Sequence, residues 1–371
     1  MVKLPKRIHN VIDGLLKDLR ARESTSSIGL FGSWSRGDAT VNSDVDLLIV
    51  DSRDFDYEYI ERIELDEVFF DLDHVPERWL LKGVPPEIDQ KLYEAQILYD
   101  KNWLLTNTKE WMAKTYWRPE RVEIRTENYL IEADTYLSRA TSASNKGDLQ
   151  SASAYTTVGL ESILKTLIEI NMLPISNSHF IEALRDSTQK LGMDEFYEDY
   201  LRISRLAGVD QEDAEERLAA FEAAWNEAIR TINERGSVIE ELHVNVRNKL
   251  NYYGKPSFLK GMALRTRSLI DSGLFVEASH YLLRTMVDML ESYGWLRASI
   301  DGVKFDYTTL FNFLKGEREA PTEIYKNSTR AMGIEELEKE AVEESLKRAR
   351  EIILNIRRRR KGLIRERVKP A

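Results

Sequence analysis

Two aspartates stand two residues apart at the start of an apolar run in the stretch GLFGSWSRGDATVNSDVDLLIV, residues 29–50. Side chains two apart on a strand point to the same side, so Asp44 and Asp46 would lie close together, with no basic residue beside them in the sequence. Two neighbouring carboxylates repel each other unless a cation lies between them. The pair therefore predicts a cation site. Mg²⁺ suits it, because this ion prefers oxygen ligands and usually keeps water and substrate phosphates in its shell.

The turn Gly32-Ser33 comes before this pair and follows another apolar run. A glycine after a strand lets backbone N–H groups approach a phosphate closely, and the start of a helix adds a favourable dipole. The Ser33 hydroxyl adds a further donor. We expect the turn to hold a triphosphate. Arg36 could contact the phosphates as well, or it could be an exposed loop arginine.

A further acid is offered by the segment EVFFDLDHVP, residues 67–76. Group transfer with two metal ions needs a third carboxylate to fix the ion that activates the attacking hydroxyl. Asp71 and Asp73 share one face of the expected strand. The position next to the strand end at Pro76 favours Asp73 as the third ligand, with Asp71 behind it or as the true ligand. Three acids and two ions would stabilise charge on the phosphates and the leaving pyrophosphate.

The order of these residues resembles the signature of the DNA polymerase β-like nucleotidyltransferase superfamily, in which Gly-Ser is followed by a glycine and then by Asp-x-Asp at the start of an apolar strand. The resemblance is carried by FGSWSRGDATVNSDVDLLIV and DLDHVP. It implies that Gly32 and Ser33 bind nucleotide phosphates, and that Asp44, Asp46 and Asp73 bind two Mg²⁺ ions, with Mn²⁺ as a substitute.

The compact spacing of the motif resembles the minimal and kanamycin nucleotidyltransferase-like enzymes. The likeness is strong over residues 25–80 and fades by residue 119. It implies an α/β head with a mixed sheet, a nucleotide substrate and, since related enzymes can complete their sites across a dimer, a homodimer.

Periodicity predicts the elements that would position these residues. Helices are expected at 7–22, 54–65, 86–96 and 102–117, and strands at 26–31, 45–50, 67–76 and 97–100. After residue 120 the strand signals end. Helices are expected at 121–148, 149–170, 213–236, 238–254 and 275–296, with Asp148 as an N-cap and Gly236 as a C-cap. The predicted fold class is α+β, an α/β head followed by an all-helical bundle.

Three regions follow from this reading: a nucleotidyltransferase domain at 1–119, a helical bundle at 120–236, and a second helical region with a basic tail at 237–371. The bundle resembles HEPN domains through KGDLQSASAYTTVGLESILKTLIEI. Active HEPN ribonucleases carry an arginine, four to six residues, and then a histidine. None of the five histidines has an arginine at that distance before it, so no ribonuclease activity is expected.

Composition limits the other classes of function. The chain has 371 residues, 42% of them hydrophobic and 31% charged, and a formal net charge of −10. Such a charge argues against a protein that coats nucleic acid over its whole surface. The sequence has no cysteine, which excludes disulfides and thiolate metal sites and suits a reducing cytosol. No apolar run is long enough for a membrane span, so a soluble, cytoplasmic protein with no membrane partner is expected.

The segment 347–371 is basic in an otherwise acidic protein. It holds eleven basic residues against two acidic ones, namely Lys347, Arg348, Arg350, Arg357, Arg358, Arg359, Arg360, Lys361, Arg365, Arg367 and Lys369 against Glu351 and Glu366. One interpretation is a solvated helix end, where basic side chains interact favourably with the helix dipole. The other is a tail that binds RNA, another polyanion or an acidic partner.

Together these observations predict a Mg²⁺-dependent nucleotidyltransferase that moves NMP from an NTP, with ATP favoured, to a hydroxyl and releases pyrophosphate. An RNA end, a protein side chain and a small hydroxylated molecule all stay open as acceptors. The alternative from another class is a non-catalytic, nucleotide-sensing module that regulates a partner. A third reading is that the two motifs coincide by chance in an unrelated α/β protein.

Overall fold

The computed structural model describes residues 4–40, 42–316 and 320–369, so the outermost residues of the first and third predicted regions lie outside it. Contacts divide the chain into two compact units. The head unit comprises Met1–Arg121 and His243–Arg265, and the body unit comprises Val122–Leu242 and Thr266–Ala371. The head unit is therefore built from two segments that are distant in sequence. The sequence reading placed residues 243–265 in a third region, and its domain boundaries stay a prediction.

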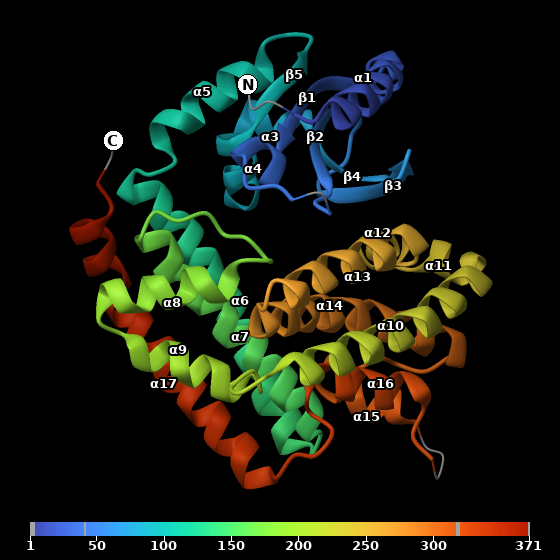
Figure 1. Cartoon of the computed structure of the whole chain (residues 1–371), viewed down its shortest axis with the longest axis vertical. Coiled ribbons are helices and arrows are strands. Elements are labelled where there is room, and N and C mark those ends of the chain that lie inside the picture. The colour runs from blue at the N-terminus through green and yellow to red at the C-terminus, as the bar shows by residue number, and fades with distance from the viewer. Residues whose placement is uncertain (1–3, 41, 317–319, 370–371) are drawn as a thin grey trace. The chain divides into compact units, whose positions relative to one another are not determined.

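The head unit combines five strands with short helices (Figure 1). Its strands are β1 (Thr25–Phe31), β2 (Val45–Asp51), β3 (Tyr59–Leu65), β4 (Val68–Pro76) and β5 (Gln96–Asp100). Its helices are α1 (Lys6–Ala21), α2 (Gly32–Arg36), α3 (Glu77–Lys82), η1 (Pro86–Ile88), α4 (Asp89–Glu94), α5 (Leu104–Thr115), α12 (Val244–Tyr253) and the part of α13 (Pro256–Asp271) that ends at Arg265.

The strands form one mixed sheet in the order β3-β4-β2-β1-β5. β2 and β4 are parallel, and the other neighbouring pairs are antiparallel. This arrangement confirms the predicted mixed α/β head. It also places β2, which begins directly after Asp44, between β4, which carries Asp71 and Asp73, and β1, which ends directly before Gly32.

Both faces of the sheet are covered, as the nearly continuous run of apolar residues in β2 predicts. One core packs α1 against the side chains of Val45, Leu47 and Ile49, and the other packs α3, α4 and α5 against those of Leu48 and Val50. Side chains two apart on a strand share a face, so Asp46 lies on the same face as Leu48 and Val50. It is the second residue of β2 and therefore lies near the end of the sheet where this strand begins.

The expected helix at 54–65 is wrong, because residues Tyr59–Leu65 form strand β3. β3 pairs with β4 through a tight turn in which Asp66 and Glu67 have positive φ values of 48° and 60°. Two successive positive φ values are what a two-residue hairpin needs, and they are usually supplied by Asn and Gly. The pair Asp-Glu gave no such signal.

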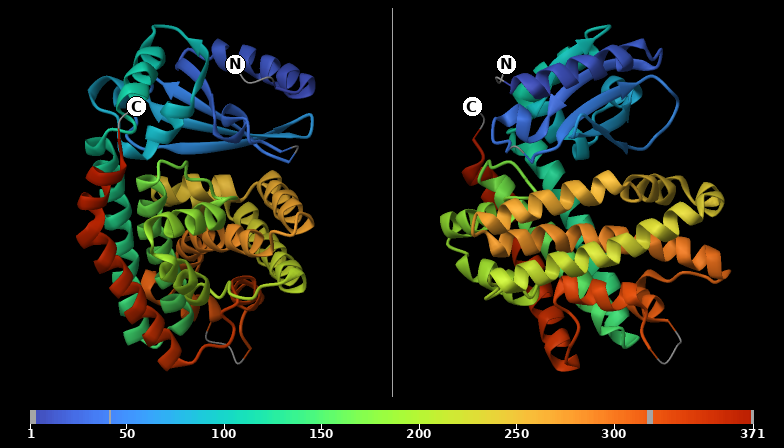
Figure 2. Two further views of the ribbon diagram at one scale, coloured as in Figure 1. Left: turned by 60° about the vertical axis from the view of Figure 1, so that its left-hand side comes forward. Right: turned by 45° about the vertical axis from the view of Figure 1, so that its right-hand side comes forward.

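The body unit is helical throughout its described part. Its elements are α6 (Pro119–Asn145, from Val122), α7 (Leu149–Ile170), α8 (Phe180–Leu191), α9 (Asp194–Ile203), α10 (Gln211–Glu234), α11 (Gly236–Glu241), α14 (Phe275–Asp301), η2 (Tyr307–Thr309), α15 (Leu310–Lys315), α16 (Glu323–Met332) and α17 (Lys339–Arg367). α17 packs along α7, and α10 packs along α14 and α16 (Figure 2). An all-helical second part was predicted, and the structure confirms it.

Three details at helix ends test the capping predictions. Asp148 caps α7, accepting a hydrogen bond of 3.0 Å from the Ser151 N–H, as predicted. Gly236 was wrongly expected to end α10. Arg235 takes that position, and Gly236 starts α11. The predicted helix 238–254 is likewise interrupted, since α11 ends at Glu241 and α12 begins at Val244.

Helix α17 carries most of the basic segment, and several of its arginines are engaged within the body unit. Arg348 pairs with Asp199 at 2.7 Å, Arg357 pairs with Asp134, and Arg360 is 3% exposed and donates to the Glu123 carbonyl at 3.1 Å. These arginines hold α17 against neighbouring helices, so they are less available to a polyanion than the sequence suggested.

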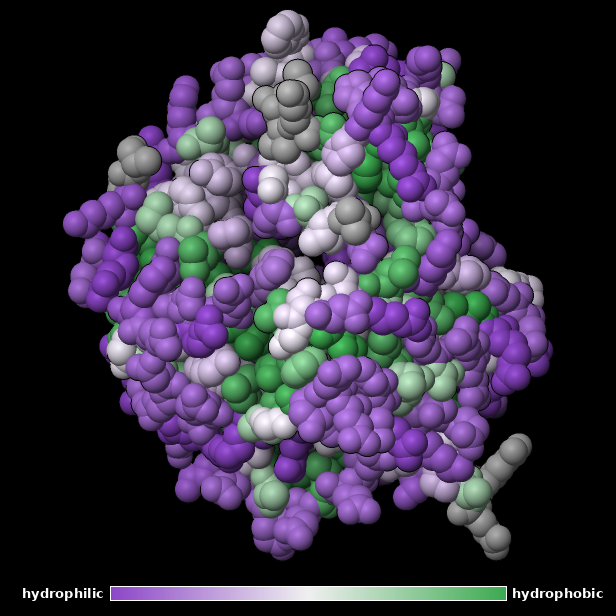
Figure 3. Space-filling view, in the orientation of Figure 1, coloured by the Kyte–Doolittle hydropathy of each residue, from purple (hydrophilic) through white to green (hydrophobic). Residues whose placement is uncertain are grey.

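The surface agrees with the composition. On the face drawn in Figure 3, hydrophilic residues prevail over hydrophobic ones. Of the helices in the described part of the chain, none combines the length and the apolar character that crossing a membrane requires.

Candidate active site

Two candidate acids and an arginine lie in one row across the sheet. Asp46 on β2 is in register with Asp71 on β4, and Asp71 is in register with Arg62 on β3. Residues in register on adjacent strands have Cβ atoms about 4.5–5.5 Å apart and share a face. The row therefore brings the order Arg, Asp, Asp together, and Asp44, two residues before Asp46, extends it.

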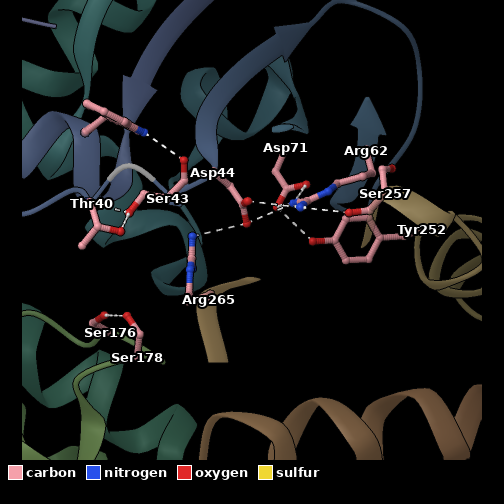
Figure 4. A network of polar contacts seen from close by, with 11 residues as sticks. Thr40, Ser43, Asp44, Arg62, Asp71, Ser176, Ser178, Tyr252, Ser257 and Arg265 are labelled. Atoms are coloured by element: carbon pink, nitrogen blue, oxygen red, sulfur yellow. Dashed lines mark hydrogen bonds and ion pairs between the residues drawn. The ribbon is translucent and has the colours of Figure 1, made fainter. Parts of the chain in front are cut away.

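Arg62 is the cation at the centre of this cluster (Figure 4). Its guanidinium donates to both carboxylate oxygens of Asp71 at 2.9 Å and to Asp44 at 3.1 Å. Arg265, from α13, lies 3.4 Å from the other oxygen of Asp44. Arg62 is only 4% exposed, and its guanidinium lies over the rings of Phe69 and Phe258. The acids are thus partly neutralised by arginines of the same unit.

Asp46 remains without a hydrogen bond or ion pair within the described residues. Burial, together with the negative charges of Asp71 and Asp44, raises the pKa of Asp46 to about 8. Burial also raises the pKa of Asp71, although Arg62 opposes this shift. For Arg62, burial would lower the pKa, but the charges of Asp71 and Asp44 outweigh it and hold that pKa well above its ordinary value. The charged form of Asp46 is therefore unfavourable in this cluster, and a further cation beside it would favour that form.

Gly32 is the residue that lets the turn approach this cluster. Its φ is +72°, and a Cβ at this position would lie 2.2 Å from the Asp46 Oδ2 atom. A side chain here would be strained by the backbone and would collide with the carboxylate. Gly32 thus joins the predicted phosphate turn and the predicted metal ligand in one place.

Asp73 has a different environment from Asp71. It lies two residues further along β4, opposite Leu48, and is 2% exposed. Its carboxylate pairs with Lys91, which also pairs with Glu58. Burial raises the pKa of Asp73 well above its usual range. Of the two acids that the sequence offered, the structure therefore groups Asp71 with Asp44 and Asp46, and Asp73 with Lys91.

Two of the three predicted nucleotide-binding residues, Gly32 and Arg36, donate to one carboxylate of the same unit. Glu94, at the end of α4, accepts a hydrogen bond from the Gly32 N–H at 3.1 Å and from Arg36 at 2.8 Å. Arg36 also pairs with Asp38 at 3.1 Å, and its side chain is 18% exposed. Ser33 lies in the first turn of α2 and is partly buried. The Glu94 carboxylate thus occupies two donors that the sequence assigned to phosphate oxygens, and phosphate binding by this turn stays a prediction.

The row of acids and the glycine turn both fall within the part of the chain that matches a known family. A family model described as "Nucleotidyltransferase domain" matches residues 12–114. This part of the chain is a nucleotidyltransferase domain. Residues 243–265 lie outside the match, although they pack into the same unit.

A short stretch of this chain is similar to a curated protein. It is a candidate protein adenylyltransferase of Methanocaldococcus jannaschii, 46% identical over 52 residues, which are 14% of this chain and 50% of that protein. The chain thus spans half the length of this relative. A solved structure of a nucleotidyltransferase-like protein from Exiguobacterium sibiricum aligns over 78% of this chain and 79% of its own, with 12% identity and a TM-score of 0.33.

Sequence reasoning missed several residues that complete the site of the nucleotidyltransferase domain. Arg62 was assigned to a helix, where its register with Asp71 cannot be seen. Tyr252, on α12, donates its hydroxyl to the Asp71 Oδ2 atom at 3.0 Å, and burial holds its pKa well above the ordinary value. Arg265 comes from α13. Neither residue has a local sequence signal, since both lie far along the chain from the motif.

No group of three or more acidic or histidine side chains is arranged as a ready metal cage within the described ranges. The position of Arg62 explains this result for the nucleotidyltransferase domain, because its guanidinium separates the carboxylates of Asp44 and Asp71. The donor set itself fits Mg²⁺, since all three candidate ligands are carboxylates and Asp46 has no hydrogen bond or ion pair with any residue that the structure describes.

Proposed function

We propose that the protein transfers a nucleoside monophosphate, AMP from ATP, to a hydroxyl acceptor and releases pyrophosphate. The observation that carries the proposal is the proximity of the Asp46 carboxylate to Gly32, flanked by Asp44 and Asp71. This carboxylate makes no hydrogen bond or ion pair in the described part of the chain. This arrangement joins a phosphate-binding turn to an acid cluster in a nucleotidyltransferase domain.

In this proposal Asp44, Asp46 and Asp71 hold Mg²⁺, or Mn²⁺ in its place. The bound ions would neutralise the triphosphate and the leaving pyrophosphate. Asp71 is preferred to Asp73 as the third acid, because Asp73 is committed to Lys91. The backbone N–H of Gly32 and the hydroxyl of Ser33 would hold phosphate oxygens. Arg36 would contact the same phosphates in place of Glu94.

The chain's own residues would also prepare the acceptor. Asp71 lies where a carboxylate can accept the proton of an incoming hydroxyl, as its bond from the Tyr252 hydroxyl illustrates. A protein hydroxyl is the favoured acceptor class, because the name of the relative from Methanocaldococcus jannaschii refers to protein adenylylation. A cytoplasmic location and a homodimer remain part of the proposal.

The test is transfer of label from each α-labelled NTP, with Mg²⁺, into separated RNA, protein and small-molecule fractions of a cell extract. The inactive control is the double variant Asp44→Asn/Asp46→Asn. The matched control is Asp66→Asn, an exposed aspartate of the same domain in the β3–β4 turn. Label in one fraction that disappears only in the double variant supports the proposal. Equal labelling by wild type and the double variant would contradict it.

The second candidate is a nucleotide-sensing module without turnover. Two observations favour it: Arg62 lies between two of the acids, and Glu94 accepts the N–H group of the phosphate turn. In this reading NTP and Mg²⁺ bind and change the affinity for a partner, but no pyrophosphate is released. Asp71→Asn would then leave nucleotide-dependent partner binding intact, whereas it would abolish transfer by an enzyme.

A further inference from the structure

Tyr252 places a hydroxyl group of the protein itself on the acid cluster. Its Oη atom donates to the Asp71 Oδ2 atom at 3.0 Å, and both residues belong to the head unit (Figure 4). The Tyr252 ring packs edge to face on Phe258 with centroids 4.8 Å apart, which fixes its direction. The hydroxyl therefore has one defined partner, Asp71. This is the carboxylate proposed to accept the proton of the acceptor hydroxyl.

The surroundings favour a nucleotide at this point. The guanidinium of Arg62 contacts Asp71 and Asp44, and Arg265 lies 3.4 Å from Asp44. Both arginines could pair with phosphate oxygens once the carboxylates hold metal ions, since guanidinium binds phosphate well. Asp46 is in register with Asp71 and lies against Gly32, so the glycine turn is close to the same acid cluster.

We propose that Tyr252 is a site of self-modification, where the protein attaches AMP to its own tyrosine hydroxyl. The proposal rests on the proposed function and names a phenolic hydroxyl as the acceptor class. The Tyr252 Oη atom forms a bond with the α-phosphorus of ATP. The bond from that phosphorus to the oxygen bridging to the β-phosphate breaks, and pyrophosphate leaves with that electron pair. The phenolic proton passes to the Asp71 carboxylate and from there to water.

This modification would change the site that produces it. The Tyr252 hydroxyl would no longer donate to Asp71, and a phosphodiester with an adenosine group would lie beside Arg62 and Arg265. The product would carry one negative charge next to these two arginines, which are its natural partners. A modified chain is therefore expected to hold its AMP group in the acid cluster and to transfer nucleotide to other acceptors more slowly.

The test is mass spectrometry of the full-length protein, as purified and after incubation with each NTP and Mg²⁺ or Mn²⁺. The expected result is a gain of one AMP, located by fragmentation on the peptide that contains Tyr252. Tyr252→Phe should lose the modification. Tyr253→Phe, the adjacent tyrosine, should keep it. Site location on the wild-type protein does not depend on how well either variant folds.

A second measurement separates this inference from the proposed function. Mn²⁺ binding by the wild-type protein, followed by electron paramagnetic resonance, and pyrophosphate release by the same protein test the proposed function without any change at Tyr252. Pyrophosphate release with an extract acceptor, without AMP on Tyr252, would overturn the inference and leave the proposed function standing. AMP on another residue that persists in Tyr252→Phe would also overturn it. Absence of both Mn²⁺ binding and pyrophosphate release would overturn the two together.

Discussion

The guanidinium of Arg62 holds both carboxylate oxygens of Asp71 at 2.9 Å, across two neighbouring strands that pair in register. One guanidinium nitrogen, Nη1, makes both contacts. In this buried place the arginine neutralises one acid of a cluster that would otherwise carry three. It has two opposite effects, because it stabilises the metal-free fold and competes with any cation for the same oxygens.

Replacement of Arg62 by alanine should therefore destabilise the protein and strengthen its response to metal. Breaking a buried ion pair by removing one partner costs about 3–5 kcal/mol. We expect chemical denaturation to show a loss of this size in Mg²⁺-free buffer, and added Mg²⁺ to restore more stability in Arg62→Ala than in wild type. Arg22→Ala is the control, because the Arg22 side chain is exposed and its ion pair with Glu61 is long, at 3.7 Å. Equal unfolding midpoints for both variants would disprove the role of Arg62.

Asp46→Asn should stabilise the metal-free protein while it removes metal binding. Burial and the neighbouring charges of Asp71 and Asp44 make the ionised Asp46 unfavourable, and the neutral amide avoids this cost. Stabilising changes at strained functional sites commonly yield about 0.5–2 kcal/mol. Denaturation in the presence of a chelator measures the gain, and a Mn²⁺ titration measures the loss of binding. A less stable variant that still binds Mn²⁺ would refute this assignment of Asp46.

Gly261→Ala should disturb the acid cluster from the opposite side. A Cβ on Gly261 would lie 2.2 Å from the Arg62 Nη2 atom, and Arg62 is held by Asp71 and Asp44 and cannot move freely. Forcing extra volume into a packed site typically costs about 1–3 kcal/mol. Gly14→Ala, in helix α1 with no atom within 4 Å of the new Cβ, should instead gain about 0.5–1 kcal/mol. Thermal melting compares the two. The prediction fails if both variants change in the same direction.

The Lys146–Asp306 pair should give the body unit a small dependence on acid pH. Its hydrogen bond from Lys146 lowers the pKa of Asp306 to about 2, below the ordinary 3.8. A depressed carboxyl pKa stabilises the fold above pH 3.8, and this stability is lost as the pH falls from there through 2. Because both side chains are nearly half exposed, we expect less than about 1 kcal/mol.

Asp306→Asn provides the measurement for that pair. It should lower the unfolding free energy slightly at pH 7, and the difference from wild type should shrink towards pH 2. A difference that grows as the pH falls would contradict the sign of the effect.

The sequence predicts most of the fold that carries the site, but it does not predict which residues of neighbouring strands pair with each other. Asp44, Asp46 and Gly32 could be found because their types and spacing are local. The choice between Asp71 and Asp73 depends on which residue of β4 lies beside Asp46, and that is decided by pairing between strands. Proximity to Pro76 was a poor substitute for register, since Asp73 lies opposite Leu48.

The strand β3 could not be predicted for a related physical reason. Ile60 and Ile63 are three residues apart, which also fits a helix. β3 is an edge strand of the sheet, and of its seven residues only Arg62 is buried, so an alternating apolar pattern is weak. The error removed Arg62 from the expected site, and with it the counter-charge of the acids.

The two-segment construction of the head unit sets an order of events when the chain is made. Asp44, Asp46 and Asp71 emerge early from the ribosome, but Tyr252, Gly261 and Arg265 follow only after the whole of Val122–Leu242 has been synthesised. Contacts between such distant segments form late and slowly, because a long loop must close first. The acid cluster therefore stays incomplete, and open on the side that α12 and α13 later cover, until most of the protein exists.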